Sequence, residues 1–162
     1  MNTRLNQSLM HHFCGVCMLT LMSSAIAETH PLTRLTSDNS KVVAQATNGV
    51  LKSTKGKFFE ASCNEEIAFD SEVIDLNKDG TPEVFTNYYG TCIGGAAGVQ
   101  VDLYIKNKAG KWIAQFGFPG TYSILKTRNK GYPDIEIGGP GSCFPIWRWN
   151  GTQYDIYKKC ER

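Results

Sequence analysis

The chain has 162 residues, with 17 Lys or Arg against 15 Asp or Glu, which gives a formal net charge of +2. This balance excludes the dense basic surface expected of a protein that binds nucleic acid or an anionic membrane. The composition is rich in Gly and aromatic residues, and the length suits one globular domain with a sizeable core.

The first 27 residues have the order of a cleaved secretory signal. Arg4 is their only charged residue, an apolar run follows from Phe13 to Met22, and Ala25-Ile26-Ala27 fits the A-x-A cleavage pattern. The run is about half of the ~20 apolar residues that a bilayer span requires. We therefore expect residues 1–27 to be removed, with no stable membrane insertion afterwards. The mature protein is expected in the periplasm or, alternatively, as a secreted protein.

Cleavage of the signal would leave an even number of cysteines. Cys14 and Cys17 would be lost, and the four that remain are Cys63, Cys92, Cys143 and Cys160. In a small exported domain, an even count predicts a disulfide framework rather than a metal site, and four cysteines allow three pairings.

Residues 28–56 are polar and turn-rich, so we expect a lead-in that is irregular or only short-helical, with 42–44 and 49–51 as its ordered pieces. Residues 57–162 alternate short runs of β-formers with turns, which predicts an all-β domain of mostly antiparallel sheet. The expected strands are Phe58–Ala61, Ile67–Ile74, Glu83–Tyr89, Val99–Lys106, Trp112–Phe118, Ser123–Lys126, Asp134–Ile137, Phe144–Trp149 and Tyr154–Lys159.

Two segments of the chain, about 51 residues apart, are similar to each other in sequence. Asn77–Val84 is similar to Asn129–Ile135, the second copy being one residue shorter, and each is followed at the same distance by a cysteine, Cys92 or Cys143. Turn chemistry limits the choice of residues, so a chance match is the alternative. The pattern predicts an internal duplication: two related hairpin units that share one core.

The last predicted hairpin discriminates among the cysteine pairings. A four-residue turn at 150–153 pairs Trp149 with Tyr154 and sets Cys143 opposite Cys160, whereas a two-residue turn would not bring these cysteines opposite each other. Aromatic cross-strand pairs stabilise an antiparallel ladder, which favours the first register. The favoured pairings are Cys63–Cys92 and Cys143–Cys160, and the main alternative is Cys92–Cys143 across the two units.

The segment from Asp75 to Glu83 has the oxygen spacing of a calcium loop. Oxygen-bearing side chains stand at positions 1, 3, 5 and 9, a glycine at position 6 allows a sharp turn, and a backbone carbonyl is available at position 7. The expected ligands are Asp75, Asn77, Asp79, Thr81 and Glu83. The second copy lacks these carboxylates, so one Ca²⁺ is predicted. The alternative is an Asx-rich β-turn without metal.

This loop departs from an EF-hand, because position 12 is Thr86 rather than Glu and the flanking segments are predicted strands. It resembles the calcium loops of the FG-GAP and VCBS repeat families, in which the carboxylate at position 9 completes a site between strands. That resemblance implies a calcium site on a β-domain.

The mature chain has few of the residues that catalysis requires. His30 is its only histidine, and Ser142 does not stand in a G-x-S-x-G motif. Asp134 and Glu136 alternate on one strand face, where they could form an acid–base pair or simply a solvated face. We therefore expect a binding protein rather than an enzyme, with hydrolysis at Asp134 and Glu136 as a minor hypothesis.

Two glycine-rich loops, Gly90–Gly98 and Gly138–Ser142, occupy corresponding places in the two units, and each holds or adjoins a cysteine. A loop fixed by a disulfide can be presented to a partner at low entropic cost. The alternative is that these glycines only form tight turns.

Together, the D-x-N-x-D-G loop, the Gly-Ser loop and the closing W-N-G-x-x-Y hairpin resemble the periplasmic inhibitors of invertebrate-type lysozyme and related immunity proteins. In those inhibitors a small Ser/Gly loop enters the cleft of the target enzyme. The resemblance implies an exported calcium-binding β-domain that inhibits a peptidoglycan-cleaving enzyme, possible targets being a lysozyme-like or amidase toxin. The corresponding loop here contains Gly139, Gly141 and Ser142. The alternative is a structural or adhesive module of the cell envelope that inhibits nothing.

Overall fold

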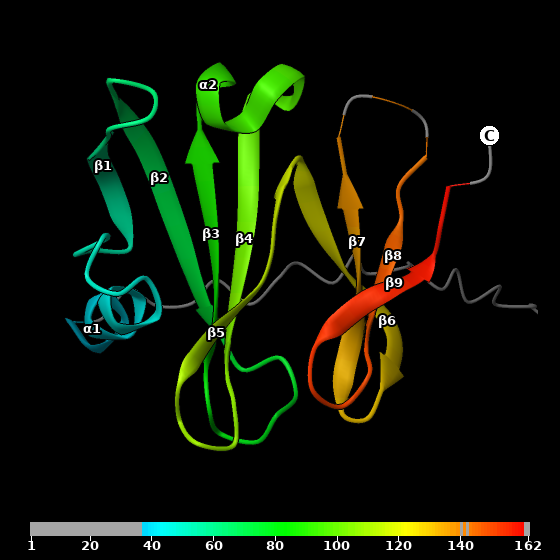
Figure 1. Ribbon diagram of the computed structural model, residues 1–162. Helices are drawn as coiled ribbons and strands as arrows, with labels where there is room; N and C mark the ends of the chain where they lie inside the picture. Colours follow the sequence, from blue (N-terminus) through cyan, green and yellow to red (C-terminus); the bar gives the residue numbers. More distant parts are fainter. Residues whose placement is uncertain (1–36, 140, 142, 161–162) are drawn as a thin grey trace, which may run out of the picture. The chain divides into compact units, whose positions relative to one another are not determined.

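The computed structural model describes residues 37–139, 141 and 143–160 (Figure 1). All of them belong to one unit of the chain, Leu32–Arg162. The predicted signal peptide, residues 28–36 of the lead-in and the predicted loop residue Ser142 lie outside the described residues.

The described residues form two antiparallel sheets, and each strand predicted from the sequence is present. The first sheet has the order β1 (Lys55–Glu60), β2 (Glu65–Ile74), β3 (Glu83–Tyr89), β4 (Val99–Lys106) and β5 (Trp112–Pro119). The second has the order β6 (Thr121–Asn129), β7 (Tyr132–Gly138), β8 (Ile146–Trp149) and β9 (Tyr154–Lys158). The helical elements are α1 (Ser37–Ala46), the single turn α2 (Thr91–Gly94) and the 3₁₀ turn η1 (Gly95–Ala97). The all-β prediction is confirmed.

The central part of the first sheet carries buried apolar side chains on both of its faces. One face packs against the second sheet, and Phe85, Leu103 and Ile135 are fully buried in this central core. The other face packs against α1 and the segment after it. Burying a side chain such as Phe85 contributes roughly 1.5–3 kcal/mol relative to leaving it exposed. These two layers fix the ends of β3, where the candidate sites lie.

Helix α1 brings part of the predicted lead-in into the fold. Val43, Ala46 and Leu51 are buried against the first sheet. The helix ends where Asn48 and Gly49 adopt left-handed φ angles of 52° and 81°, a conformation that Gly and Asn tolerate best. Neither α1 nor α2 is long and apolar enough to cross a membrane.

Both disulfides have the favoured pairing. Cys63–Cys92 joins the β1–β2 turn to α2, and Cys143–Cys160 joins the segment before β8 to the end of β9, with Cα–Cα distances of 5.9 and 5.5 Å. The alternative Cys92–Cys143 pairing is therefore wrong. In the chain-entropy account, closing loops of 29 and 17 residues contributes roughly 3–4 kcal/mol each.

The last hairpin has the predicted pairs Trp149–Tyr154 and Trp147–Ile156, with one difference beyond them. A register shift between Ile146 and Trp147 places Ile146 opposite Lys158, one residue away from the regular ladder. Cys143 precedes β8, so it reaches Cys160 from an irregular segment rather than as a cross-strand neighbour.

The two sheets repeat one arrangement of strands. The succession β2–β5 and the succession β6–β9 are both four-stranded antiparallel meanders, and a cysteine follows the second strand of each. The internal duplication stays a prediction, and this correspondence of strands supports it.

Candidate functional site

The motifs found in the sequence lie at opposite ends of the strands. Because β3 and β7 each run from one end of the sheets to the other, the β2–β3 loop and the β6–β7 turn share one end, and the two glycine-rich loops share the other. Figure 1 shows α2 and the arrowheads of β3 and β7 at the top, with the β2–β3 loop at the bottom.

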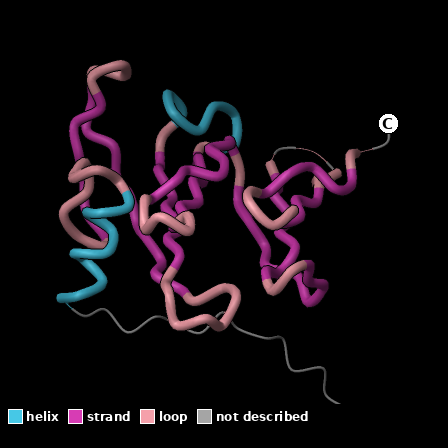
Figure 2. Tube along the Cα trace, turned by 60° about the horizontal axis from the view of Figure 1, so that its bottom comes forward, coloured by secondary structure: helices cyan, strands magenta, loops and turns pink. Residues whose placement is uncertain are grey.

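The end with the glycine-rich loops contains a pocket of about 310 Å³. In Figure 2 the helical turns α2 and η1, drawn in cyan, cover the end of the first sheet on one side of this region. The pocket is lined by small and apolar residues with a few polar groups: Ala96, Ala97, Val99, Gly120, Thr121, Ser123, Glu136, Gly138, Gly139 and Phe144. It therefore joins both glycine-rich loops, a proximity that the sequence alone did not predict.

Close backbone contacts explain why glycines gather here. A Cβ atom on Gly94 would lie 2.2 Å from the Val99 nitrogen, and one on Gly120 would lie 2.0 Å from the Gly138 oxygen. A Cβ on Gly138 would lie 3.0 Å from the Phe144 ring. The glycines thus do form tight turns, and the same contacts bring the walls of the pocket together.

Among the described residues that line the pocket, Glu136 is the only ionisable one. Its side chain is half-buried on β7, opposite Ser123 of β6 and Ile146 of β8. Within the described part of the chain, its carboxylate takes part in no side-chain hydrogen bond and no ion pair. Sequence reasoning considered Glu136 only for catalysis, and it missed Phe144, Thr121 and Ser123, whose contribution depends on the packing of β6 against the β7–β8 loop.

Asp134, two residues earlier on the same strand, is fully engaged. Arg148 donates from Nε and Nη2 to its two carboxylate oxygens at 2.8 and 2.6 Å, and the Thr127 hydroxyl donates at 2.6 Å. The hydrogen bonds from Arg148 are the main reason why the pKa of Asp134 lies below its usual value, and the bond from Thr127 lowers it further. The guanidinium also lies 3.4 Å from the centre of the Tyr157 ring. This engagement argues against the hypothesis of an Asp134–Glu136 acid–base pair.

Of the three residues predicted to contact a partner, Gly139 lines the pocket and Gly141 lies in an exposed bend. Ser142 lies outside the described residues. The predicted partner loop and the pocket therefore occupy the same end of the molecule.

At the opposite end, polar side chains close the β2–β3 loop over its own backbone. Asp75 accepts hydrogen bonds from the Asp79 and Gly80 amides at 3.1 and 2.9 Å, and Asp79 accepts one from the Thr81 amide at 2.7 Å. The Thr81 amide and the Asn77 side-chain amide lower the pKa of Asp79. Gly80 takes the left-handed φ of 85° that the sharp turn requires.

Glu83 is buried, unlike Asp75 and Asp79, and its carboxylate is hydrogen-bonded to the first part of the β2–β3 loop. Its side chain is 1% exposed; Oε2 accepts from the Leu76 amide at 2.7 Å and Oε1 from the Tyr132 hydroxyl at 2.9 Å. Burial raises the pKa of Glu83 to about 7. Among the described residues, the carboxylates of Asp75, Asp79 and Glu83 do not gather within 4.8 Å of one another.

The donor set of this loop nevertheless suits a hard cation. Asp75 and Asp79 offer exposed side-chain oxygens and the half-buried Asn77 a third, the Thr81 carbonyl lies beside them in sequence, and calcium prefers oxygen ligands. A carboxylate oxygen has two acceptor positions, so the hydrogen bonds to Glu83 leave capacity for a further contact.

The β6–β7 turn, which the sequence comparison pairs with the predicted calcium loop, packs directly against that loop. Arg128 donates from Nη2 to the Leu76 carbonyl at 2.5 Å and to the Gly131 carbonyl at 2.6 Å. The loop is thus tied to both sheets, through Arg128 and through the Tyr132–Glu83 hydrogen bond.

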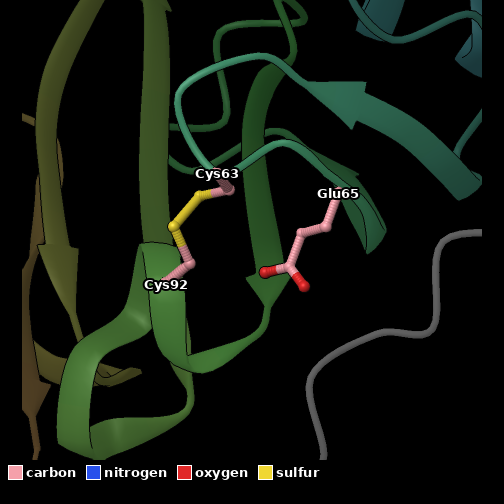
Figure 3. A group of neighbouring side chains, drawn as sticks. All are labelled: Cys63, Glu65 and Cys92. Carbon is pink, nitrogen blue, oxygen red and sulfur yellow. A yellow bond between two sulfur atoms is a disulfide. The ribbon is translucent and has the colours of Figure 1, made fainter.

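Figure 3 shows three residues whose side chains lie close enough together to suggest a metal site: Cys63, Glu65 and Cys92. The two sulfurs are bonded to each other, so neither is the thiolate that metal binding requires. Glu65 is an exposed carboxylate beside a disulfide, and this group is not a metal centre.

The fold and the site define a class of protein: an antiparallel all-β protein with two disulfides and a pocket between two glycine-rich loops. Comparison of the chain with protein-family models, curated proteins and solved structures gives no match. A functional relation to lysozyme inhibitors and immunity proteins is therefore a proposal.

Proposed function

We propose that this chain is an exported, calcium-binding β-domain that binds and inhibits a peptidoglycan-cleaving enzyme, of the lysozyme-like or amidase type. The observation that carries the proposal is the shared end of the two glycine-rich loops, with a pocket of about 310 Å³ between them. A protein that blocks an enzyme benefits from a pre-organised contact surface, and the two disulfide-anchored loops at this end would supply one.

The rigidity of that surface has two sources. Each loop is anchored by a disulfide, at Cys92 and at Cys143, and the glycine backbones touch neighbouring backbone directly. Since a pre-organised loop loses little conformational entropy on binding, more of the contact energy contributes to affinity. The two disulfides are compatible with any oxidising compartment. The periplasm is the particular compartment that we propose.

Calcium has a structural role in this proposal, because the β2–β3 loop lies at the end of the strands remote from the pocket. The ion would be held by Asp75, Asn77, Asp79, the Thr81 carbonyl and Glu83, and its charge would offset the repulsion among three carboxylates. Titration calorimetry of the oxidised protein with CaCl₂ tests this. We expect binding heat from wild type and from the control Glu66→Gln, but none from Asp75→Ala/Asp79→Ala. Equal heats from all three would contradict the calcium assignment.

Inhibition is tested with the protein made from its full-length gene and purified after export in its oxidised form. Release of dyed peptidoglycan is measured with a lysozyme of each major type and with an amidase. We expect one of these activities to be inhibited by wild type, and inhibition to be lost in Gly139→Arg, which adds a long side chain at the pocket. Ala109→Arg, which adds the same side chain to the exposed β4–β5 turn, is the control and should still inhibit.

The alternative, a structural or adhesive envelope module, predicts a different result. Such a module would sediment with purified cell walls without slowing any of these enzymes. Sedimentation without inhibition would therefore replace the proposed function with this one.

A further inference from the structure

The pocket between the glycine-rich loops has the chemistry of a site for a positive charge. Most of its lining is uncharged, from alanine, glycine and hydroxyl side chains. Glu136 alone carries a charge there, so the sign of the potential inside the pocket is set by its carboxylate. A cationic group is thus the complementary ligand.

The cations on neighbouring strands do not neutralise Glu136. Arg148 on β8 is bound to Asp134 and stacked on Tyr157. Lys158 on β9 lies opposite Ile146, which itself lies opposite Glu136, and no ion pair joins Lys158 to Glu136 in the described part of the chain. A half-buried carboxylate without a protein partner is free to pair with a bound cation, and such charge-assisted hydrogen bonds are the stronger ones.

The walls of the pocket add a second feature. The Phe144 ring lines it and is 39% exposed, and it is held against Gly138. The face of an aromatic ring attracts cations, and arginine in particular stacks on such rings. A volume of about 310 Å³ is at the lower limit for small-molecule sites, so it suits a single side chain better than a large cofactor.

We propose that this pocket receives a basic side chain, arginine or lysine, from the protein partner, with the Glu136 carboxylate as its counter-ion and Phe144 as its apolar wall. This inference rests on the proposed function, and it names the group by which the target is recognised.

The first test uses small probes and needs no target enzyme. Two-dimensional ¹H–¹⁵N NMR spectra of the exported, oxidised protein are recorded during titration with N-acetyl-arginine amide, N-acetyl-lysine amide, N-acetyl-citrulline amide and N-acetylglucosamine. We expect the two cationic probes to shift the amide signals of Ala97 and Gly139. The isosteric but neutral citrulline probe should have little effect, and 0.5 M NaCl should weaken the response because it screens the charge pair.

Variants assign the effect to the carboxylate. Glu136→Gln should weaken the arginine response at least about tenfold, which corresponds to about 1.4 kcal/mol. The control Glu66→Gln, at an exposed position of β2, should leave the response unchanged. An equal response to arginine and citrulline, or to arginine in wild type and Glu136→Gln, would overturn the proposal. A response to N-acetylglucosamine alone would identify a glycan site instead and would also overturn it.

Inhibition assays separate this inference from the proposed function. If wild type and Glu136→Gln inhibit the same hydrolase equally, the protein is an inhibitor and the inference about the pocket is wrong. If arginine binds through Glu136 but no hydrolase is inhibited, the cation site stands and the proposed target class is wrong.

Discussion

The hydroxyl of Tyr132, on the second sheet, donates a 2.9 Å hydrogen bond to the buried carboxylate of Glu83, on the first. The same carboxylate accepts the Leu76 amide from the β2–β3 loop. One side chain therefore connects the predicted calcium loop, the central core and the turn that corresponds to that loop in the second unit.

Removal of the Tyr132 hydroxyl should weaken this connection. In Tyr132→Phe the ring still packs against Trp149, but the buried carboxylate loses one of its two donors. Leaving such a group less satisfied costs about 1–3 kcal/mol, which urea unfolding followed by tryptophan fluorescence would measure. Tyr89→Phe removes a hydroxyl–carboxylate bond to Asp70 at an exposed position, and should cost less. Equal losses in the two variants would contradict the importance assigned to burial.

Glu83→Gln should separate the structural role of this residue from its predicted role as a calcium ligand. The glutamine carbonyl can accept from the Leu76 amide, and its NH₂ group can donate to the Tyr132 oxygen, so both hydrogen-bonded positions are kept. We therefore expect the free energy of unfolding in EDTA to stay near that of wild type. Addition of calcium should raise the melting temperature of wild type more than that of the variant, since the variant lacks one carboxylate.

That expectation fails if calcium raises both melting temperatures equally. Such a result would leave Glu83 as a structural group of the core, with any calcium held by the exposed part of the loop.

The strands could be predicted from sequence because the signals are local. Val101, Leu103 and Ile105 alternate along β4 with less buried residues. Most of β3 is buried because both of its faces are covered. The disulfides followed from the register of one hairpin, in which Trp149 faces Tyr154. In each case a spacing of a few residues carried the information.

The sites were harder to predict because they depend on contacts between distant segments. The inward orientation of Glu83 requires Tyr132, 49 residues away in sequence. The isolation of Glu136 is evident only once Arg148 is seen to bind Asp134. The sequence predicts a glycine loop where the structure has the helical turn α2, because glycines disfavour helix. The turn is held by the packing of Gly94 against Val99 and by the disulfide at Cys92, which are contacts with other parts of the chain.

The Asp134–Arg148 pair predicts a loss of stability in acid. The pKa of Asp134 is lower in the folded protein than in the unfolded chain, so the folded state favours the ionised form. Its contribution is complete above the unfolded pKa of about 4 and disappears as the pH falls through the lower folded pKa. Asp134→Asn should cost about 1.5–3 kcal/mol at pH 7. The difference from wild type should shrink steadily below pH 4.

Melting temperatures of both proteins between pH 7 and pH 2.5 measure this effect. Glu66→Gln, which alters an exposed carboxylate 4.0 Å from Lys57, should show almost no difference at any pH. A gap between wild type and Asp134→Asn that stays constant down to pH 2.5 would mean that the ion pair does not set the pKa of Asp134.

Gly120 joins the two sheets at the pocket, and its replacement should affect both stability and binding. Its φ of 135° is unfavourable for other residues, and a Cβ there would lie 2.0 Å from the Gly138 oxygen, so the β7–β8 loop would have to move. Gly110 has a φ of 76° but no atom within 4 Å of a Cβ, so Gly110→Ala isolates the backbone cost of about 1–2 kcal/mol. Gly120→Ala should cost clearly more in urea unfolding, and it alone should shift the NMR signals of Ala97 and Gly139. If both variants lose the same stability and leave those signals in place, the contact between Gly120 and Gly138 does not shape the pocket.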